Sequence, residues 1–486
     1  MADTVTITKS DTIPLVESEA RAEHDLLGED RIPNSAYWGI HTKRAVENFP
    51  ITGVPVGHFP ELVQALAMVK KAAARANRKL GFLPKDKAAV IEQACDAIIA
   101  GKHVDQFVVD AIQGGAGTST NMNANEVIAN VALEMMGRDK GDYDALHPNN
   151  DVNMSQSTND AYPTAVRLAI LLANPRLVKA LDELSYALKE KAVEFGDVLK
   201  MGRTQLQDAV PMTLGQEFDA FYTTVKEDIA RLHELSSFFR EVNLGATAIG
   251  TGINADPRYA SLAVEELSHV SGQEMVLAGN LIEATSDMGA FVLFSGLLKR
   301  IAVKLSKICN DLRLLSSGPR TGFGEIRLPA VQAGSSIMPG KVNPVIPEVV
   351  NQVAFLVIGN DLTVTLASEG GQLQLNAFEP TIAFCILQSM RGLTAALDTL
   401  TVRCIRGITA DRERCRNLAI NSIGVVTALN PILGYEVCSR VARTALDTGR
   451  SVVDIVLEEK LLTEAQVALL LKPESMTMPS RATAEA

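Results

Sequence analysis

The stretch FVLFSGLLKRIAVKLSKICNDLRLL, residues 291–315, is the part of the chain that best defines the fold class. Its large apolar residues are separated by steps of three and four, which is the repeat of a helix that buries one face. They are Phe291, Phe294, Leu298, Ile301, Leu305, Ile308, Leu312 and Leu315. At 1.5 Å per residue, the pattern predicts a helix roughly 40 Å long.

Other segments repeat this spacing, within residues 62–80, 177–188 and 218–239 and from Val350 onward. The first ends at Gly81, a typical residue for stopping a helix, and Pro84 follows it. Strand-like alternation is scarce. We therefore predict an all-α protein, with a central bundle of long helices flanked by smaller, mainly helical N- and C-terminal domains. The expected domains are residues 1–156, 157–411 and 412–486, and the wide apolar faces of the bundle favour self-association.

Composition excludes several classes of protein. The 486 residues exceed one hydrophobic core, and a content of 47% hydrophobic and 21% charged residues is ordinary for a globular protein. The net charge of −11 argues against general nucleic-acid binding, which needs clustered Lys and Arg. No apolar run approaches the ~20 residues that span a bilayer, and the N-terminus does not resemble a secretory signal. Six scattered cysteines without a CxxC pair indicate reduced thiols and a cytoplasmic protein.

Four polar islands interrupt the helical pattern, and each combines Gly or Pro with Ser, Thr, Asn or Gln. They are residues 114–126, 155–165, 201–211 and 334–344. Residues of these types cap helices and form turns, so capping would explain any single island. Capping needs about one such residue at a helix end, and four dense islands exceed that need.

The islands do not match the loops that bind nucleotide phosphates. Five residues separate Gly334 from Gly340, where a Walker A loop has four, and Thr120 stands where a dinucleotide fingerprint has its third Gly. The islands instead offer many neutral hydrogen-bond donors together with the cation of Lys341. This inventory suits a small molecule with two carboxylates.

Two other residue types leave alternatives open. Arg203 could contact such a ligand, or it could cap a helix or pair with Asp208. None of the seven histidines lies inside an island, although His147 is close to one. The most usual general base is therefore missing from the expected site.

The loop GSSIMPGKVNP, residues 334–344, resembles the signature loop of the aspartase/fumarase superfamily. Residues 25–49, 156–165, 202–218, 241–254 and 345–353 resemble the same superfamily, so the resemblance covers nearly the whole chain. Thr158 stands where fumarases typically have a second serine, which favours the aspartase branch. The resemblance implies a lyase that reversibly deaminates L-aspartate to fumarate and ammonia, with a class II fumarase as the alternative. It also implies a homotetramer whose active sites are each shared by three subunits.

The same resemblance implies roles for single residues. Ser335 would be the catalytic base that removes a proton from Cβ. The expected hydrogen-bond donors around the β-carboxylate are Thr118, Ser157, Thr158 and Ser336. The expected contacts of the α-carboxylate are Lys341 and Asn343, and those of the leaving amino group are Asn159 and Thr204. Gln205 stands where many members have His, so its contact with substrate is left open.

A serine hydroxyl is a poor base unless its alkoxide is stabilised. Amides of the glycine-rich loop can surround the oxygen, and Lys341 can add positive charge. Gly334 and Gly340 would let the loop close over the substrate and exclude water. No acidic cluster resembles a Mg²⁺ site. We expect no required cofactor, and Mg²⁺ activation, which occurs in some members, is left open.

Overall fold

The structure is a computed structural model that describes residues 19–477. The chain divides into two compact units. The first contains Met1–Pro175, His233–Gly296 and Gly359–Met390, and the second contains Arg176–Leu232, Leu297–Ile358 and Arg391–Ala486. The three domains expected from the sequence follow the linear order of the chain, and their boundaries stay a prediction.

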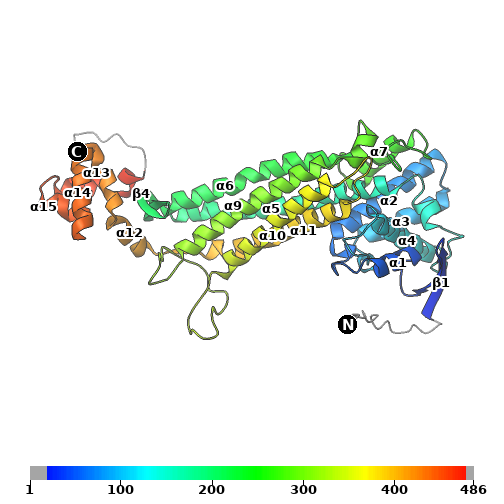
Figure 1. Cartoon of the computed structure of the whole chain (residues 1–486), viewed down its shortest axis with the longest axis horizontal. Coiled ribbons are helices and arrows are strands. Elements are labelled where there is room, and N and C mark those ends of the chain that lie inside the picture. Colours follow the sequence, from blue (N-terminus) through cyan, green and yellow to red (C-terminus); the bar gives the residue numbers. More distant parts are fainter. Residues whose placement is uncertain (1–18, 478–486) are drawn as a thin grey trace, which may run out of the picture. The chain divides into compact units, whose positions relative to one another are not determined.

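Long helices dominate the described residues, as the periodic segments predicted (Figure 1). They are α5 (Thr158–Glu194), α6 (Leu214–Ser236), α9 (Gly289–Leu315), α10 (Val345–Glu369) and α11 (Glu379–Arg403). In the first unit, Ser295 of α9 donates a hydrogen bond to Asp361 of α10 at 2.9 Å. In the second, Lys304 of α9 pairs with Asp228 of α6 at 3.0 Å. The predicted all-α fold with a bundle of long helices is confirmed.

The rest of the first unit is built from shorter helices and two small sheets. Its helices are α1 (Ile40–Asn48), α2 (Pro60–Leu80), α3 (Lys85–Ile99), α4 (Thr118–Met135), α7 (Tyr259–Ser271), α8 (Leu281–Ser286) and a π-helix at Pro148–Val152. Its strands are β1 (Ala20–Asp25), β2 (Gly28–Pro33), β5 (Glu241–Val242) and β6 (Val276–Leu277), with β1 antiparallel to β2 and β5 parallel to β6. As predicted, α2 ends at Gly81, whose φ of 83° is left-handed.

The second unit contains two more small sheets and a group of short helices. The antiparallel strand pairs are β3 (Leu199–Thr204) with β4 (Gln207–Thr213), and β7 (Ile326–Arg327) with β8 (Thr409–Ala410). The helices are α12 (Arg412–Ile420), α13 (Val426–Leu433), α14 (Tyr435–Thr448), α15 (Val452–Glu458), α16 (Glu464–Leu470) and α17 (Pro473–Met476). Helices α13 to α16 share a small apolar core that includes Val441 and Val456.

Helix α10 corrects one expectation. It is long and apolar enough to cross a membrane by length and composition, whereas we found no such run in the sequence. Its apolar run is broken by Asn351, Asn360 and Asp361, so no long apolar stretch stands out in the sequence although the mean hydropathy of the helix is high. Length and composition alone do not separate such a helix from the core helix of a bundle.

The N-terminus of α1 is capped by a side chain from another helix. The carboxylate of Glu126, on α4, accepts hydrogen bonds from the backbone amides of Gly39, His41 and Thr42 at 2.8, 2.9 and 3.1 Å. It also accepts the hydroxyl of Thr42 at 2.6 Å. Glu126, the last residue of the first polar island, therefore caps a helix, which is the structural role that the capping interpretation assigned to the islands.

Glu379, the first residue of α11, is buried, and neither carboxylate oxygen has a hydrogen-bond partner among the described residues. Burial raises its pKa to about 8, although the positive charge of Arg167 opposes the shift. Between the unfolded pKa, near 4.5, and about 8, the folded chain therefore holds more protons than the unfolded chain. The contribution of Glu379 to the free energy of unfolding therefore falls as the pH rises through this range.

Replacing Glu379 by Gln removes this ionisable group. We expect Glu379→Gln to flatten the fall in stability and to stabilise the protein above about pH 8 by a few kcal/mol. Urea unfolding at several pH values measures the effect. Glu369→Gln, at the exposed end of α10, is the matched control and should leave the slope unchanged. Equal slopes for Glu379→Gln and the parent protein would contradict the prediction.

Candidate active site

The sequence-predicted residues fall into two groups, one in each unit. The first unit contains Thr118, Ser157, Thr158 and Asn159, and the second contains Thr204, Gln205, Ser335, Ser336, Lys341 and Asn343.

Two helices of the first unit begin at candidate residues. Thr118 is the first residue of α4 and Thr158 is the first residue of α5. Gly117 precedes α4 with a left-handed φ of 87°, and a Cβ there would lie 2.4 Å from the ring of Tyr162, so a glycine is required. The partial positive charge of a helix N-terminus suits a carboxylate. At α4 the Thr118 hydroxyl already donates to the carbonyl of Gly115 at 2.7 Å, and a ligand would have to replace that bond.

A hydrogen-bond relay reaches Thr158 from the core of the first unit. Asn121 donates to the hydroxyl oxygen of Thr158 and to Oδ1 of Asn153, both at 3.2 Å. Lys70 donates to Asn153 and Gln156, both at 2.8 Å. Because the Thr158 oxygen accepts here, its own hydrogen is available for a bound anion.

Lys70 is a residue that the sequence analysis missed. It is fully buried, and the loss of hydration lowers its pKa to about 7, although Asp160 opposes the shift. Lys70 follows Leu66 by four residues and so lies on the apolar face of α2. A lysine at a core-facing position is the signal that could have identified it.

The residues that begin α5 are held by Asp160. Its Oδ1 accepts the backbone amide of Ser157 at 3.0 Å. The Ser157 hydroxyl accepts the amide of Asn159 at 3.2 Å, so its hydrogen also remains available to a ligand. Burial raises the pKa of Asp160 to about 6, against three backbone hydrogen bonds and Lys70 that lower it.

The loop of residues 334–344 lies in the second unit and folds on itself. Gly334 donates to the carbonyl of Lys341 at 2.8 Å, and Asn343 donates to the carbonyl of Gly334 at 2.7 Å. Inside this loop, the Ser335 hydroxyl accepts the amides of Ile337 at 3.2 Å and Met338 at 3.0 Å. Bonds to the amides two and three residues ahead are those of a serine turn, which is the structural alternative for Ser335. The same two amides would also stabilise an alkoxide at that oxygen.

A cavity of about 620 Å³ in the second unit is lined by Lys341 and Asn343. Three arginines also line it, namely Arg313, Arg320 and Arg327. Arg327 pairs with Asp411 at 2.8 Å. The excess of cations over carboxylates gives this cavity the charge that a dianionic ligand requires.

The third polar island is a β-hairpin, which the sequence analysis did not predict. Thr204 ends β3, and the exposed residues Gln205 and Leu206 form the turn with φ values of 53° and 63°. Such left-handed turns usually contain Asn or Gly, and neither residue is present at these positions.

Arg203 is held by structural contacts. Its guanidinium pairs with Glu325 at 2.6 Å and with Asp208 at 3.9 Å, and it lies 4.1 Å over the ring of Phe323. Glu325 is buried and also pairs with Lys200 at 3.1 Å. The ion-pair interpretation of Arg203 is confirmed, with Glu325 as the closer partner.

His147 also has a structural role. Its Nδ1 accepts the amides of Asn149 and Asn150 at 3.0 and 3.2 Å and so caps the π-helix. Burial lowers its pKa, and Asp151 opposes the shift. Among residues 19–477 no group of three or more His, Cys, Asp or Glu side chains is placed to hold a metal ion.

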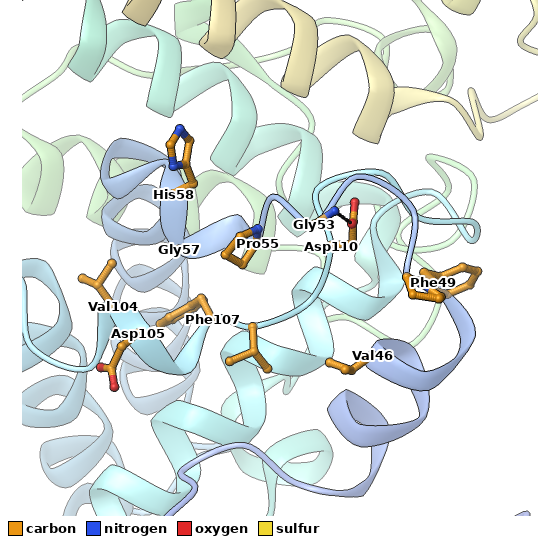
Figure 2. A pocket seen from close by; sticks show the side chains of 12 residues that line it. Val46, Phe49, Gly53, Pro55, Gly57, His58, Val104, Asp105, Phe107 and Asp110 are labelled. Atoms are coloured by element: carbon orange, nitrogen blue, oxygen red, sulfur yellow. Dashed lines mark hydrogen bonds between the residues drawn. The ribbon is translucent and has the colours of Figure 1, made fainter. Parts of the chain in front are cut away.

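Another cavity, of about 640 Å³, lies in the first unit and contains none of the predicted residues (Figure 2). Apolar side chains such as Val46, Phe49 and Phe107 line much of it. Asp110 also lines it, but its carboxylate accepts the amides of Gly53 and of Thr52 at 2.9 and 2.7 Å. This lining does not suit a dicarboxylate, so the candidate site remains with the polar islands.

Comparison with known proteins supports the same class. A family described as "Lyase" matches residues 28–359, and one described as "Fumarase C C-terminus" matches residues 425–478. An aspartate ammonia-lyase of Pseudomonas aeruginosa is 66% identical over 95% of this chain and 98% of that protein. One of Escherichia coli K12 is 54% identical over 96% of this chain and 98% of that protein.

Solved structures agree. A "fumarate lyase:delta crystallin from Brucella melitensis bound to cobalt" is 61% identical, has a TM-score of 0.92, and matches 95% of this chain and 100% of that chain. A recombinant class II fumarase from Schistosoma mansoni is 32% identical and has a TM-score of 0.89. The match covers 95% of this chain and 99% of that chain. Fold and sequence thus define a lyase. The chain belongs to the aspartase/fumarase superfamily.

Proposed function

We propose that the chain catalyses the reversible deamination of L-aspartate to fumarate and ammonia. The observation that carries this proposal is the identity of 54–66% to proteins named aspartate ammonia-lyase, over nearly the whole chain. A class II fumarase is the second candidate, because a relative with that title shares the fold at 32% identity. The two reactions share fumarate and differ in whether ammonia or water leaves.

The difficult step is removal of a weakly acidic proton from Cβ. It places a second negative charge on the β-carboxylate, giving an aci-carboxylate. Donors that are already oriented stabilise this charge better than water does, because they need no reorganisation. We assign this role to the hydroxyls of Thr118, Ser157, Thr158 and Ser336. The hydroxyl oxygens of Ser157 and Thr158 accept hydrogen bonds, and neither hydroxyl donates one within residues 19–477, which supports the assignment.

Ser335 is our candidate for the base. Its hydroxyl must release its own proton to solvent water, before the loop closes, and can then take one from Cβ, so the alkoxide needs stabilisation. The amides of Ile337 and Met338 supply two donors at that oxygen. Lys341, in the same loop, adds positive charge, and closure of the loop would exclude water.

The remaining contacts orient the substrate. Lys341 and Asn343 are assigned to the α-carboxylate, and Asn343 keeps one amide hydrogen after its bond to Gly334. Asn159 and Thr204 are assigned to the amino group, which leaves as ammonia after Cα–N cleavage. Gln205 receives no role. The scheme uses no metal, and assays with and without a chelator decide whether Mg²⁺ activates the enzyme, a question that the sequence leaves open.

We further propose a homotetramer whose sites combine residues of three subunits. Helix α10 supports self-association, because it carries an exposed apolar row at helical spacing. The row includes Phe355, Leu356, Leu362 and Leu366, each more than 60% exposed. A face this apolar usually marks an interface between proteins.

A charge in this row should prevent assembly. Leu362→Glu is expected to give a smaller species and to lose activity, because each shared site would then be incomplete. Light scattering coupled to size exclusion measures the mass. Leu446→Glu, at a residue of α14 with 68% exposure, is the control and should keep the parent mass. An unchanged mass for Leu362→Glu would contradict this interface.

Incubation with L-aspartate, and separately with L-malate, tests the reaction itself. Fumarate is followed by its ultraviolet absorbance. The proposal expects fumarate from L-aspartate. Fumarate from L-malate alone would make the chain a fumarase, and turnover of neither compound by correctly folded protein would indicate a non-catalytic relative.

A further inference from the structure

One motif of the sequence has no role in the mechanism above. Residues 243–252 form a loop that packs against the start of α5 in the first unit. The carbonyl oxygen of Ala248 accepts the side-chain amide of Asn159 at 2.7 Å. Asn243 in turn donates to the backbone carbonyl of Asn159 at 3.0 Å. The loop therefore holds both the backbone and the side chain of this candidate residue.

Asp160 fastens the same loop to α5. Its Oδ2 accepts the backbone amides of Gly245 and Thr247 at 3.0 and 2.9 Å. Its Oδ1 accepts the amide of Ser157, so one buried carboxylate joins the loop to the candidate residues that begin α5. A buried acceptor with three amide partners holds its neighbours in one arrangement, because leaving any donor unpaired is costly.

These contacts determine which way the amide group of Asn159 faces. Its nitrogen is bound to the Ala248 carbonyl, and its Oδ1 has no hydrogen-bond partner within residues 19–477. A carbonyl oxygen only accepts hydrogen bonds, and an ammonium group only donates them. An amide in this orientation therefore presents an acceptor that is complementary to an ammonium group, while one of its two N–H donors is already used by the Ala248 carbonyl.

We propose that the 243–252 loop is a positioning element that presents the Asn159 carbonyl oxygen to the ammonium group of the substrate. The proposal rests on the proposed function and deepens it. Asp160 and Asn243 are then positioning residues that act through Asn159. The loop should affect recognition of the amino group and leave recognition of the two carboxylates unchanged.

The glycines of the loop provide a way to move it. Gly250 has a φ of 99°, and a Cβ there would lie 2.4 Å from the backbone of Ile282. An alanine at this position would have to displace the loop, including Ala248. Gly279, outside the loop and just before α8, does not have a left-handed φ, and a Cβ there would meet no atom within 4 Å. It offers the control in the same unit.

The test compares two ligands in Gly250→Ala and Gly279→Ala. L-aspartate carries the ammonium group, and succinate, used as a competitive inhibitor, has both carboxylates without it. Gly250→Ala should lower kcat/KM for L-aspartate by at least ~10-fold, the scale of a small misplacement of a contact group. Its inhibition constant for succinate should stay within about twofold of the parent value. Gly279→Ala should resemble the parent for both ligands.

An equal loss for succinate and L-aspartate in Gly250→Ala would overturn the proposal, as would unchanged kinetics with both. If Gly250→Ala does not fold, Asn243→Ala replaces it, because this change removes the bond to the Asn159 carbonyl without a steric clash. The same selective loss is expected there, and a parallel loss for both ligands would again overturn the proposal. Failure of the proposed function is distinguishable, because the parent protein would then not deaminate L-aspartate.

Discussion

Replacing Ser335 by alanine is expected to lower the turnover of L-aspartate by at least ~10²-fold, the usual scale for losing a general base. The side chain lies in an exposed loop, where its oxygen accepts the amides of Ile337 and Met338. Alanine removes the oxygen and leaves most of the loop's backbone contacts in place, including that between Gly334 and Lys341. The fold and the assembly should therefore survive.

The kinetic pattern distinguishes a base from a binding residue. Loss of a base lowers kcat while substrate binding is retained. The inhibition constant of succinate, measured on the residual activity of Ser335→Ala, should therefore stay near the parent value. Steady-state kinetics and circular dichroism on the same preparation provide the measurements. Near-normal turnover, with contamination by the parent enzyme excluded, would remove Ser335 from its role.

The second large effect is expected at Lys341. Lys341→Met removes the cation that we assign to the α-carboxylate, and a lost charge-assisted hydrogen bond should raise KM for L-aspartate by ~10- to 100-fold. The constant for succinate should rise as well, because succinate keeps the carboxylates. This response differs from the one expected for Gly250→Ala, which affects L-aspartate alone.

Turnover by Lys341→Met should also fall, because Lys341 adds positive charge near the Ser335 oxygen. Lys472→Met, at an exposed lysine of the same unit, is the control and should behave like the parent protein. If KM for L-aspartate and the inhibition constant of succinate both match the parent values in Lys341→Met, Lys341 is not a carboxylate contact.

Much of the fold could be predicted because local sequence patterns determine where the helices begin and end. The steps of three and four in residues 291–315 became helix α9, and Gly81 ended α2 where the sequence indicated. The β3–β4 hairpin could not be predicted. Its turn places Gln205 and Leu206 in left-handed conformations, without the Gly or Asn that signals such a turn. Tertiary contacts there override local preference.

For the candidate site too, the sequence predicted some features and not others. Residue types within the islands could be predicted, because dense hydroxyls and amides exceed what capping requires. Their partners could not, since Lys70 is 83 residues from Asn153 and Arg203 is 122 residues from Glu325. Only the folded chain brings such residues together. The gathering of the two groups of candidate residues into one site depends on assembly, and it stays a prediction.

The reverse reaction, run in one vessel, shows directly whether ammonia or water adds to fumarate. Fumarate and an ammonium salt in D₂O allow two additions, because ammonia at Cα gives aspartate and water gives malate. The account predicts L-aspartate carrying one deuterium at Cβ, because the proton returned to Cβ comes from solvent through the base. Product analysis by mass spectrometry identifies it. Malate as the product, with no aspartate formed, would contradict the account.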